Sequence, residues 1–156
     1  MKKTVRFNNI LFPIWLFWLL PTYVWLIILP ANFVIDSLVL VLAMNVLRLE
    51  NKLSIWKHSI LKVWIIGFVS DFIGAAAIFG IMLVLDSLIP RFNTMLFPGT
   101  TLISLPGVAL AGVLIYFLNR RFSFTKCGLS AAQVHKLCLA LAVFTAPHAM
   151  MIPLYG

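Results

Sequence analysis

The sequence has few charged residues, and acidic residues are the scarcest of them. Only 10% of its 156 residues are charged, and Asp and Glu together number 4 against 12 Lys and Arg. Soluble domains carry about 25% charged residues, and a soluble core of this length could not bury a chain that is 63% hydrophobic. The composition therefore excludes an ordinary soluble domain and predicts that lipid surrounds most of the chain.

Cysteine is scarce and familiar catalytic motifs are missing. Cys127 and Cys138 form no CxxC pattern, so we expect free thiols rather than a disulfide framework. The sequence contains no HExxH, no GxSxG and no Gly-Asp pair of the intramembrane aspartyl-protease kind. His135 and Cys138 share a helical face, but with Cys127 they make only a loosely spaced set of metal ligands. We therefore expect no enzyme activity, no cofactor and no metal site.

Long hydrophobic runs, in contrast, cover most of the sequence. A transmembrane helix needs about 20 apolar residues, and five segments qualify. They predict a single all-α membrane domain over residues 1–156, with helices at about 9–29, 31–47, 61–88, 99–118 and 131–152. We expect a tight turn at Pro30–Asn32 between the first two helices. Ser130 and Gln133 have the spacing of a capping box at the start of the last one.

The distribution of basic residues predicts the orientation. If the N-terminus lies inside, the inner segments hold every Lys and Arg except Arg91. This positive-inside pattern predicts an N-in, C-out multi-pass protein, placed in the bacterial cytoplasmic membrane, and accounts for the net charge of +8 without a nucleic-acid partner. Residues 51–62 have the pattern of a short interfacial amphipathic segment. We expect four basic residues to contact lipid head groups, namely Lys52, Lys57, Arg120 and Arg121.

Three ionisable residues fall near the middle of the predicted bilayer. An Asp at the centre of a membrane helix costs about 2.5–3.5 kcal/mol on insertion scales. Counted from the nearest basic residue at the inner end of each helix, Asp71 lies roughly 13 Å into the membrane, and Asp36 and His148 roughly 18 Å. The three are therefore expected at similar depth on three different helices, with Asp71 as the central residue.

Two polar residues accompany this set. Asn32 shares a helical face with Asp36, and Thr145 shares one with His148. Pro147 removes a backbone donor beside them and leaves the carbonyl four residues earlier without its helical partner. The five side chains either hold the helices together by hydrogen bonds, or form a site where protons or cations bind within the membrane.

Small residues form stripes on two of the predicted helices. Such stripes let helix backbones approach closely in a membrane. One stripe lies on the helix predicted over 61–88 and one on the helix predicted over 99–118. They consist of Ser70, Gly74 and Ala77, and of Ser104, Gly107 and Ala111.

Residues 117–124, FLNRRFSF, resemble the Asn-Arg-aromatic-Thr-Phe stretch of GtrA-type membrane proteins. That family is associated with moving polyprenyl-linked sugars across membranes. It usually has four spans with two after this stretch, whereas one predicted span follows it here. The resemblance covers only these residues, and we do not extend the family's function to the whole chain.

Three functional classes remain open at this stage. The leading hypothesis is a small membrane transport protein for a cation, a proton or a small solute, built around the intramembrane acids. The alternative is a non-catalytic accessory or assembly subunit of a membrane complex. A third class, a flippase-like protein for a lipid-linked substrate, follows from the resemblance and the basic inner face. A bundle this small is expected to form a homo-oligomer or to join a partner membrane subunit.

Overall fold

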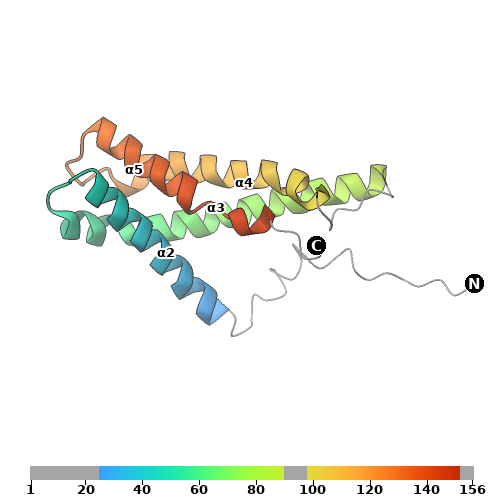
Figure 1. Ribbon diagram of the computed structural model, residues 1–156, viewed down its shortest axis with the longest axis horizontal. Helices are drawn as coiled ribbons and strands as arrows, with labels where there is room; N and C mark the ends of the chain where they lie inside the picture. Colours follow the sequence, from blue (N-terminus) through green and yellow to red (C-terminus); the bar gives the residue numbers. More distant parts are fainter. Residues whose placement is uncertain (1–24, 90–97, 152–156) are drawn as a thin grey trace, which may run out of the picture.

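The computed structural model describes residues 25–89 and 98–151, and all regular structure in these two ranges is helical (Figure 1). The described elements are α2 (Trp25–Val46), α3 (Lys52–Leu88), α4 (Gly99–Leu118), the π-helical turn η2 (Asn119–Ser123), α5 (Ala131–Phe144) and the 3-10 turn η3 (His148–Met151). Three helices are long and apolar enough to cross a membrane, namely α2, α3 and α4 with η2. These three helices indicate a membrane-embedded protein.

The helix α2 contradicts the predicted turn at Pro30–Asn32, because one helix runs through Pro30 without a break. Proline lacks an N–H and so removes one backbone hydrogen bond, the one to the carbonyl of Leu26. The missing bond lies in the first turns of α2, and the residues after Pro30 continue the helix to Val46. The helices predicted over 9–29 and 31–47 are therefore not separated at Pro30. Residues 9–24 of the first lie outside the described residues.

The helix α3 is longer than predicted. Its 37 residues span about 55 Å, and they include most of residues 51–62, which therefore do not form a separate interfacial segment. The first turns pack inward instead, with Ile55 and Ile60 buried. The indole N–H of Trp56 donates to the hydroxyl of Ser37 on α2 at 2.7 Å. This contact ties the start of α3 to α2.

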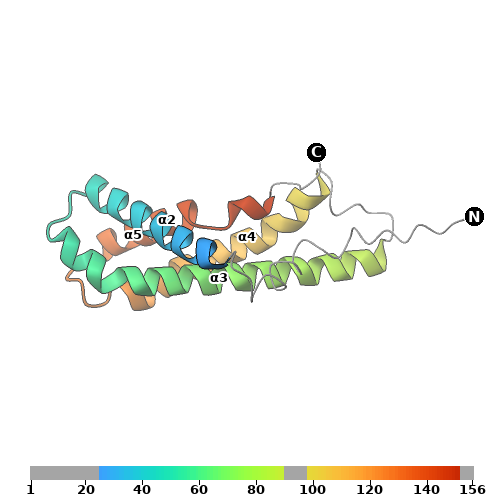
Figure 2. The same cartoon turned by 90° about the horizontal axis from the view of Figure 1, so that it is seen from below.

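α3 and α4 lie side by side over most of the length of α4 (Figures 1 and 2). Their closest approach is at two glycines, since a Cβ added to Gly74 would lie 2.7 Å from the carbonyl oxygen of Gly107 and 3.0 Å from the Cβ of Ala111. Such an approach is possible only without side chains at the crossing. Of the other stripe residues, Ser70, Ser104 and Ala111 are buried and Ala77 is half-buried.

The helix α5 begins at the predicted capping box. The backbone N–H of Gln133 donates to the hydroxyl of Ser130 at 3.3 Å, and the N–H of Ser130 donates to the Gln133 side chain at 2.9 Å. The predicted continuation to residue 152 is wrong, because α5 ends at Phe144. Pro147 explains the end, since its ring would clash with the carbonyl four residues earlier and it has no N–H to donate. The chain continues as η3, which packs against α4.

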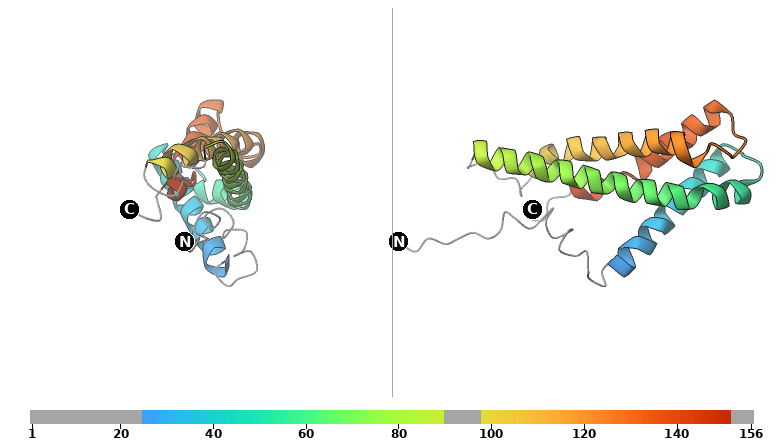
Figure 3. Two further views of the ribbon diagram at one scale, coloured as in Figure 1. Left: turned by 90° about the vertical axis from the view of Figure 1, so that its right-hand side faces the viewer. Right: turned by 180° about the vertical axis from the view of Figure 1, so that it is seen from behind.

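The buried apolar core lies where α2 ends and α3 and α5 begin. In Figure 3 these ends gather at one end of the bundle, and the first turns of α2 diverge from α4 and α5. The core takes fully buried side chains from all four α-helices, namely Leu40, Met44, Val63, Ile115, Leu137 and Leu141. Because the helices pack together at this end, the depth of a residue in the middle of the bundle follows from its distance along the helix from this core.

Candidate intramembrane acidic site

Asp36 is a buried acid in the middle of α2, with 6% of its surface exposed. It packs against α3 at Gly67, where an added Cβ would lie 3.3 Å from the Asp36 Oδ2 atom. The missing side chain at Gly67 therefore makes room for the carboxyl group directly against the α3 backbone. α2 continues unbroken on both sides of Asp36, so the helix itself fixes the position of the acid along its axis.

Thr145, at the end of α5, brings a third element to this position. The Thr145 side chain interacts with the Asp36 carboxyl group, and the Thr145 hydroxyl donates to the carbonyl oxygen of Leu141 at 2.9 Å. A hydroxyl has one hydrogen and two acceptor sites. The same hydroxyl can thus donate to an ionised Asp36, or donate to Leu141 while accepting a hydrogen from a protonated Asp36.

Asp71 lies on α3 one helical turn after Gly67, on the same face. Its carboxyl group interacts with that of Asp36 as a like charge. The Oδ1 atom of Asp71 and the hydroxyl of Ser70 are buried, and within the described ranges neither has a hydrogen-bond partner. Buried polar atoms in proteins are nearly always paired, so these two unpaired atoms set this position apart from the rest of α3.

No described basic residue balances these two acids. The nearest Lys on α3 is Lys62, nine residues before Asp71, or roughly 13 Å along the helix. On α2 the nearest is Arg48, twelve residues after Asp36, or roughly 18 Å. Neither acid forms an ion pair with another residue in the part of the chain that the structure describes. The described part of the chain therefore supplies no positive charge that neutralises the pair.

His148 and Asn32, the other predicted members of the set, lie differently. The His148 side chain is exposed, and its Nε2 atom is 2.7 Å from the carbonyl oxygen of Val143. This is the carbonyl that Pro147 leaves without a backbone donor, so the imidazole has a local structural partner. Asn32 is half-buried, one turn before Asp36 on α2. The structure thus joins Asp36, Asp71 and Thr145.

Gly67 belongs to the site although the sequence reading overlooked it. A glycine inside a helical pattern is unfavourable by about 1 kcal/mol and suggests a close approach of another group. Gly67 lies four residues before Asp71, so both are on one face. The spacing of four residues between Gly67 and Asp71 could therefore have predicted that Gly67 makes room for the carboxyl group of Asp36.

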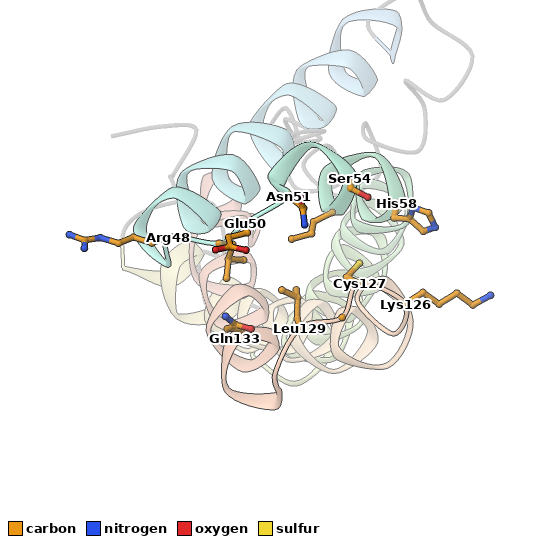
Figure 4. Close-up of a pocket in the computed structure, with 12 residues that line it drawn as sticks. Arg48, Glu50, Asn51, Ser54, His58, Lys126, Cys127, Leu129 and Gln133 are labelled. Carbon is orange, nitrogen blue, oxygen red and sulfur yellow. The ribbon is translucent and has the colours of Figure 1, made fainter.

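A polar pocket lies at the basic end of the bundle, with a volume of about 650 Å³. The loop after α2, the first turns of α3 and the loop before α5 surround it, and the side chains of Arg48 and Lys126 extend away from it (Figure 4). Two residues of its wall, Arg48 and Asn51, have left-handed backbone angles (φ 49° and 53°) that non-glycine residues seldom adopt. Cys127 also lines it, and burial raises the pKa of this thiol although Lys62 opposes the shift.

The four residues predicted to contact lipid head groups all lie at this basic end, and two have partners within the protein. The Lys52 ammonium donates to the Asn45 side chain at 2.7 Å, and the Arg120 guanidinium donates to the Tyr116 hydroxyl at 2.8 Å. The side chains of Lys57 and Arg121 are exposed. Arg120 is exposed as well, so Lys57 and Arg121 are the exposed members of the set without such a hydrogen bond to a described residue.

The FLNRRFSF stretch contains the π-helical turn η2, and its asparagine faces inward. Asn119 is fully buried, and its amide donates to the carbonyl of Ile115 at 2.8 Å. The hydroxyl of Ser123 donates to the Asn119 side-chain oxygen at 2.6 Å. The polar residues of this stretch thus close the widened helical turn, and the neighbouring arginines remain outside.

Fold and site together define the class: an all-helical, membrane-embedded protein with an acidic pair between two of its helices. Comparison of the chain with models of known families, with characterised proteins and with solved structures found no match. The similarity of residues 117–124 to GtrA-type proteins therefore stays a local resemblance.

Proposed function

We propose that this protein is a small integral membrane transport protein that moves a proton, a cation or a small solute, with Asp36 and Asp71 as its central binding groups. The observation that carries the proposal is the proximity of two acids on adjacent helices, Asp36 buried and Asp71 half-buried, with the buried Oδ1 atom of Asp71 unpaired among the described residues. Ionisable residues inside membrane helices commonly mark ion or proton pathways.

The energetics of the pair support binding of a positive charge. Each ionised acid in the membrane interior costs about 2.5–3.5 kcal/mol on insertion scales, and two like charges close together add repulsion. A proton or cation shared by Asp36 and Asp71 removes both penalties. Binding of a proton or cation to the pair is therefore favoured. Neither acid has a fixed basic partner among the described residues, so no ion pair has to form or break when the proton or cation is released.

The Thr145 hydroxyl supplies a way to respond to the bound charge. When Asp36 is ionised, the hydroxyl can donate to it, and when Asp36 is protonated the hydroxyl can donate to Leu141 instead. Both states keep every group in this small network paired. The end of α5 thus has two hydrogen-bond arrangements that depend on the charge of a residue on α2.

We further propose five membrane segments with the N-terminus inside, in a bacterial cytoplasmic membrane, and the charge distribution supports the orientation. Every Lys and Arg within the described ranges lies at the end of the bundle where α2 ends and α3 begins. This is the arrangement that the positive-inside rule associates with the cytoplasmic side.

A second candidate is an accessory or assembly subunit of a membrane complex, in which the acids only hold helices together. The observation that favours it is the low burial of the spanning helices. Only 11% of the most apolar window of α2 and 28% of that of α3 are buried within the protein. Helices with so much free surface can associate with another subunit or with further copies of this chain, and the transport proposal also requires such an assembly to enclose a pathway.

The experiment that separates the two candidates is ion flux into liposomes that contain a pH-sensitive dye. Wild-type protein should dissipate an imposed pH or cation gradient, and Asp71→Asn should abolish the flux while inserting and melting like wild type. Asp86→Asn is the matched control, because it removes the same charge from an exposed position on the same helix and should retain flux.

The outcomes divide the candidates clearly. Absence of flux from folded wild-type protein in gradients of protons, Na⁺ and K⁺ would count against transport of these ions. A lower melting temperature of Asp71→Asn in detergent, with no flux to lose, would favour the assembly role.

A further inference from the structure

An apolar groove separates α2 and α5 on the outside of the bundle, with a volume of about 680 Å³. Each helix contributes one stripe of side chains at intervals of three or four residues, so each stripe is a single helical face. On α2 these include Val39, Leu42 and Val46, and on α5 Leu139 and Val143. Apart from Lys136, every side chain that lines the groove is thus apolar.

One end of the groove carries a positive charge. Lys136 lines it, one helical turn before Leu139 on the same face of α5. Its side chain is exposed, and it lies at the basic end of the bundle, where α5 begins. No described carboxylate lines the groove. A lysine stem can follow an apolar surface while its ammonium reaches the polar layer of the membrane.

We propose that this groove binds one anionic phospholipid, with an acyl chain between α2 and α5 and the phosphate against the ammonium of Lys136. An apolar channel that ends in an unbalanced cation matches an amphiphile with an apolar tail and a negative head. The site uses neither Asp36 nor Asp71, so it goes beyond the transport proposal and stands independently of it.

The length of the groove distinguishes a lipid chain from a partner helix. From Lys136 to Phe144, its last lining residue on α5, the groove extends about 12 Å along the helix. One leaflet contributes about half of a hydrocarbon core of roughly 30 Å. The groove is therefore slightly shorter than one leaflet is deep, which matches one acyl chain better than a helix that contacts its neighbour across the whole hydrocarbon core.

The test measures lipid retention on the purified full-length protein by native mass spectrometry. The probes are phosphatidylglycerol and phosphatidylcholine with identical acyl chains, supplied in equal amounts. Wild-type protein should retain one phosphatidylglycerol in preference to phosphatidylcholine. Lys136→Ala should weaken that retention about fivefold, the effect of one basic residue near an anionic surface. Lys126→Ala is the matched control, because Lys126 is exposed at the same end, does not line the groove and is not among the residues predicted to contact lipid head groups.

A second variant tests the acyl chain rather than the charge. Leu42 is 60% exposed, so Leu42→Trp can place a bulky side chain in the groove without disturbing the core. This variant should also lose the retained phosphatidylglycerol. Equal losses in Lys136→Ala and Lys126→Ala would overturn the proposal, since they would indicate general surface attraction. Retention of phosphatidylglycerol at the wild-type level by Leu42→Trp would also overturn the proposal. If that variant changed only the oligomeric mass, the occupant of the groove would be a second copy of the chain.

Discussion

Alanine at Gly74 tests the closest helix contact of the structure. The added Cβ would lie 2.7 Å from the Gly107 carbonyl oxygen, about 0.7 Å closer than the 3.4 Å at which ordinary contact begins. The obstacle is backbone, so no side-chain rotation relieves it and α3 must move away from α4. Overpacking of this kind costs about 1–3 kcal/mol, whereas replacing glycine by alanine in a helix gains about 1 kcal/mol.

Gly80 provides the matched control for this change. It lies on the same helix, and an added Cβ there meets nothing within 4 Å among the described residues. Gly80→Ala should therefore show only the gain in helix propensity. The two variants should differ in unfolding free energy by about 1–3 kcal/mol, with Gly74→Ala the less stable. Thermal melting in detergent, followed by circular dichroism, measures the difference. Equal melting temperatures would refute the close packing of α3 on α4 at this position.

Two further predictions concern the basic end of the bundle. Ser130→Ala should lower the unfolding free energy by about 1 kcal/mol through loss of the α5 cap, whereas Ser130→Asn keeps an acceptor and should melt near wild type; equal melting of both variants would contradict the cap. Because burial raises the pKa of Cys127, less thiolate is present at neutral pH. Maleimide should therefore label Cys127 more slowly than a fully exposed cysteine, and the labelling rate should rise as the pH increases. Cys138 is fully buried and should label only after unfolding, as mass spectrometry of wild type and Cys127→Ser would show.

The sequence predicted apolar helices better than their ends. The range 99–118 matches α4, because a run of apolar residues between Pro98 and the polar residues from Asn119 onward has clear limits. Pro30 and Pro147 both lack an N–H and crowd the carbonyl four residues earlier, but only one of them ends a helix. α2 continues through Pro30, whereas α5 stops before Pro147. There the side chains of Thr145 and His148 contact the last carbonyls of α5, and such tertiary alternatives are not visible in a helical pattern.

The position of the helix ends also determined which residues of the site could be predicted from the sequence. Distances along continuous helices placed Asp36 and Asp71 at similar depth, and the structure makes them neighbours. The residue from the last helix depended on where α5 ends. With the helix ending at Phe144, Thr145 reaches Asp36 and His148 lies exposed on the next turn. Sequence depth arguments therefore hold within a helix and fail beyond its last residue.

The length of α3 divides the protein between two solvents. Its run from Val63 to Leu85 covers about 33 Å, enough for the hydrocarbon layer of roughly 30 Å, so we expect the turns from Lys52 to Lys62 to extend into the head groups and water. The part of the core beside these turns is held by the hydrophobic effect, which urea weakens. The glycine contact between α3 and α4 is surrounded by lipid, where packing rather than water exclusion holds helices together. Urea should therefore loosen the basic end of the bundle while the membrane-embedded helices remain associated.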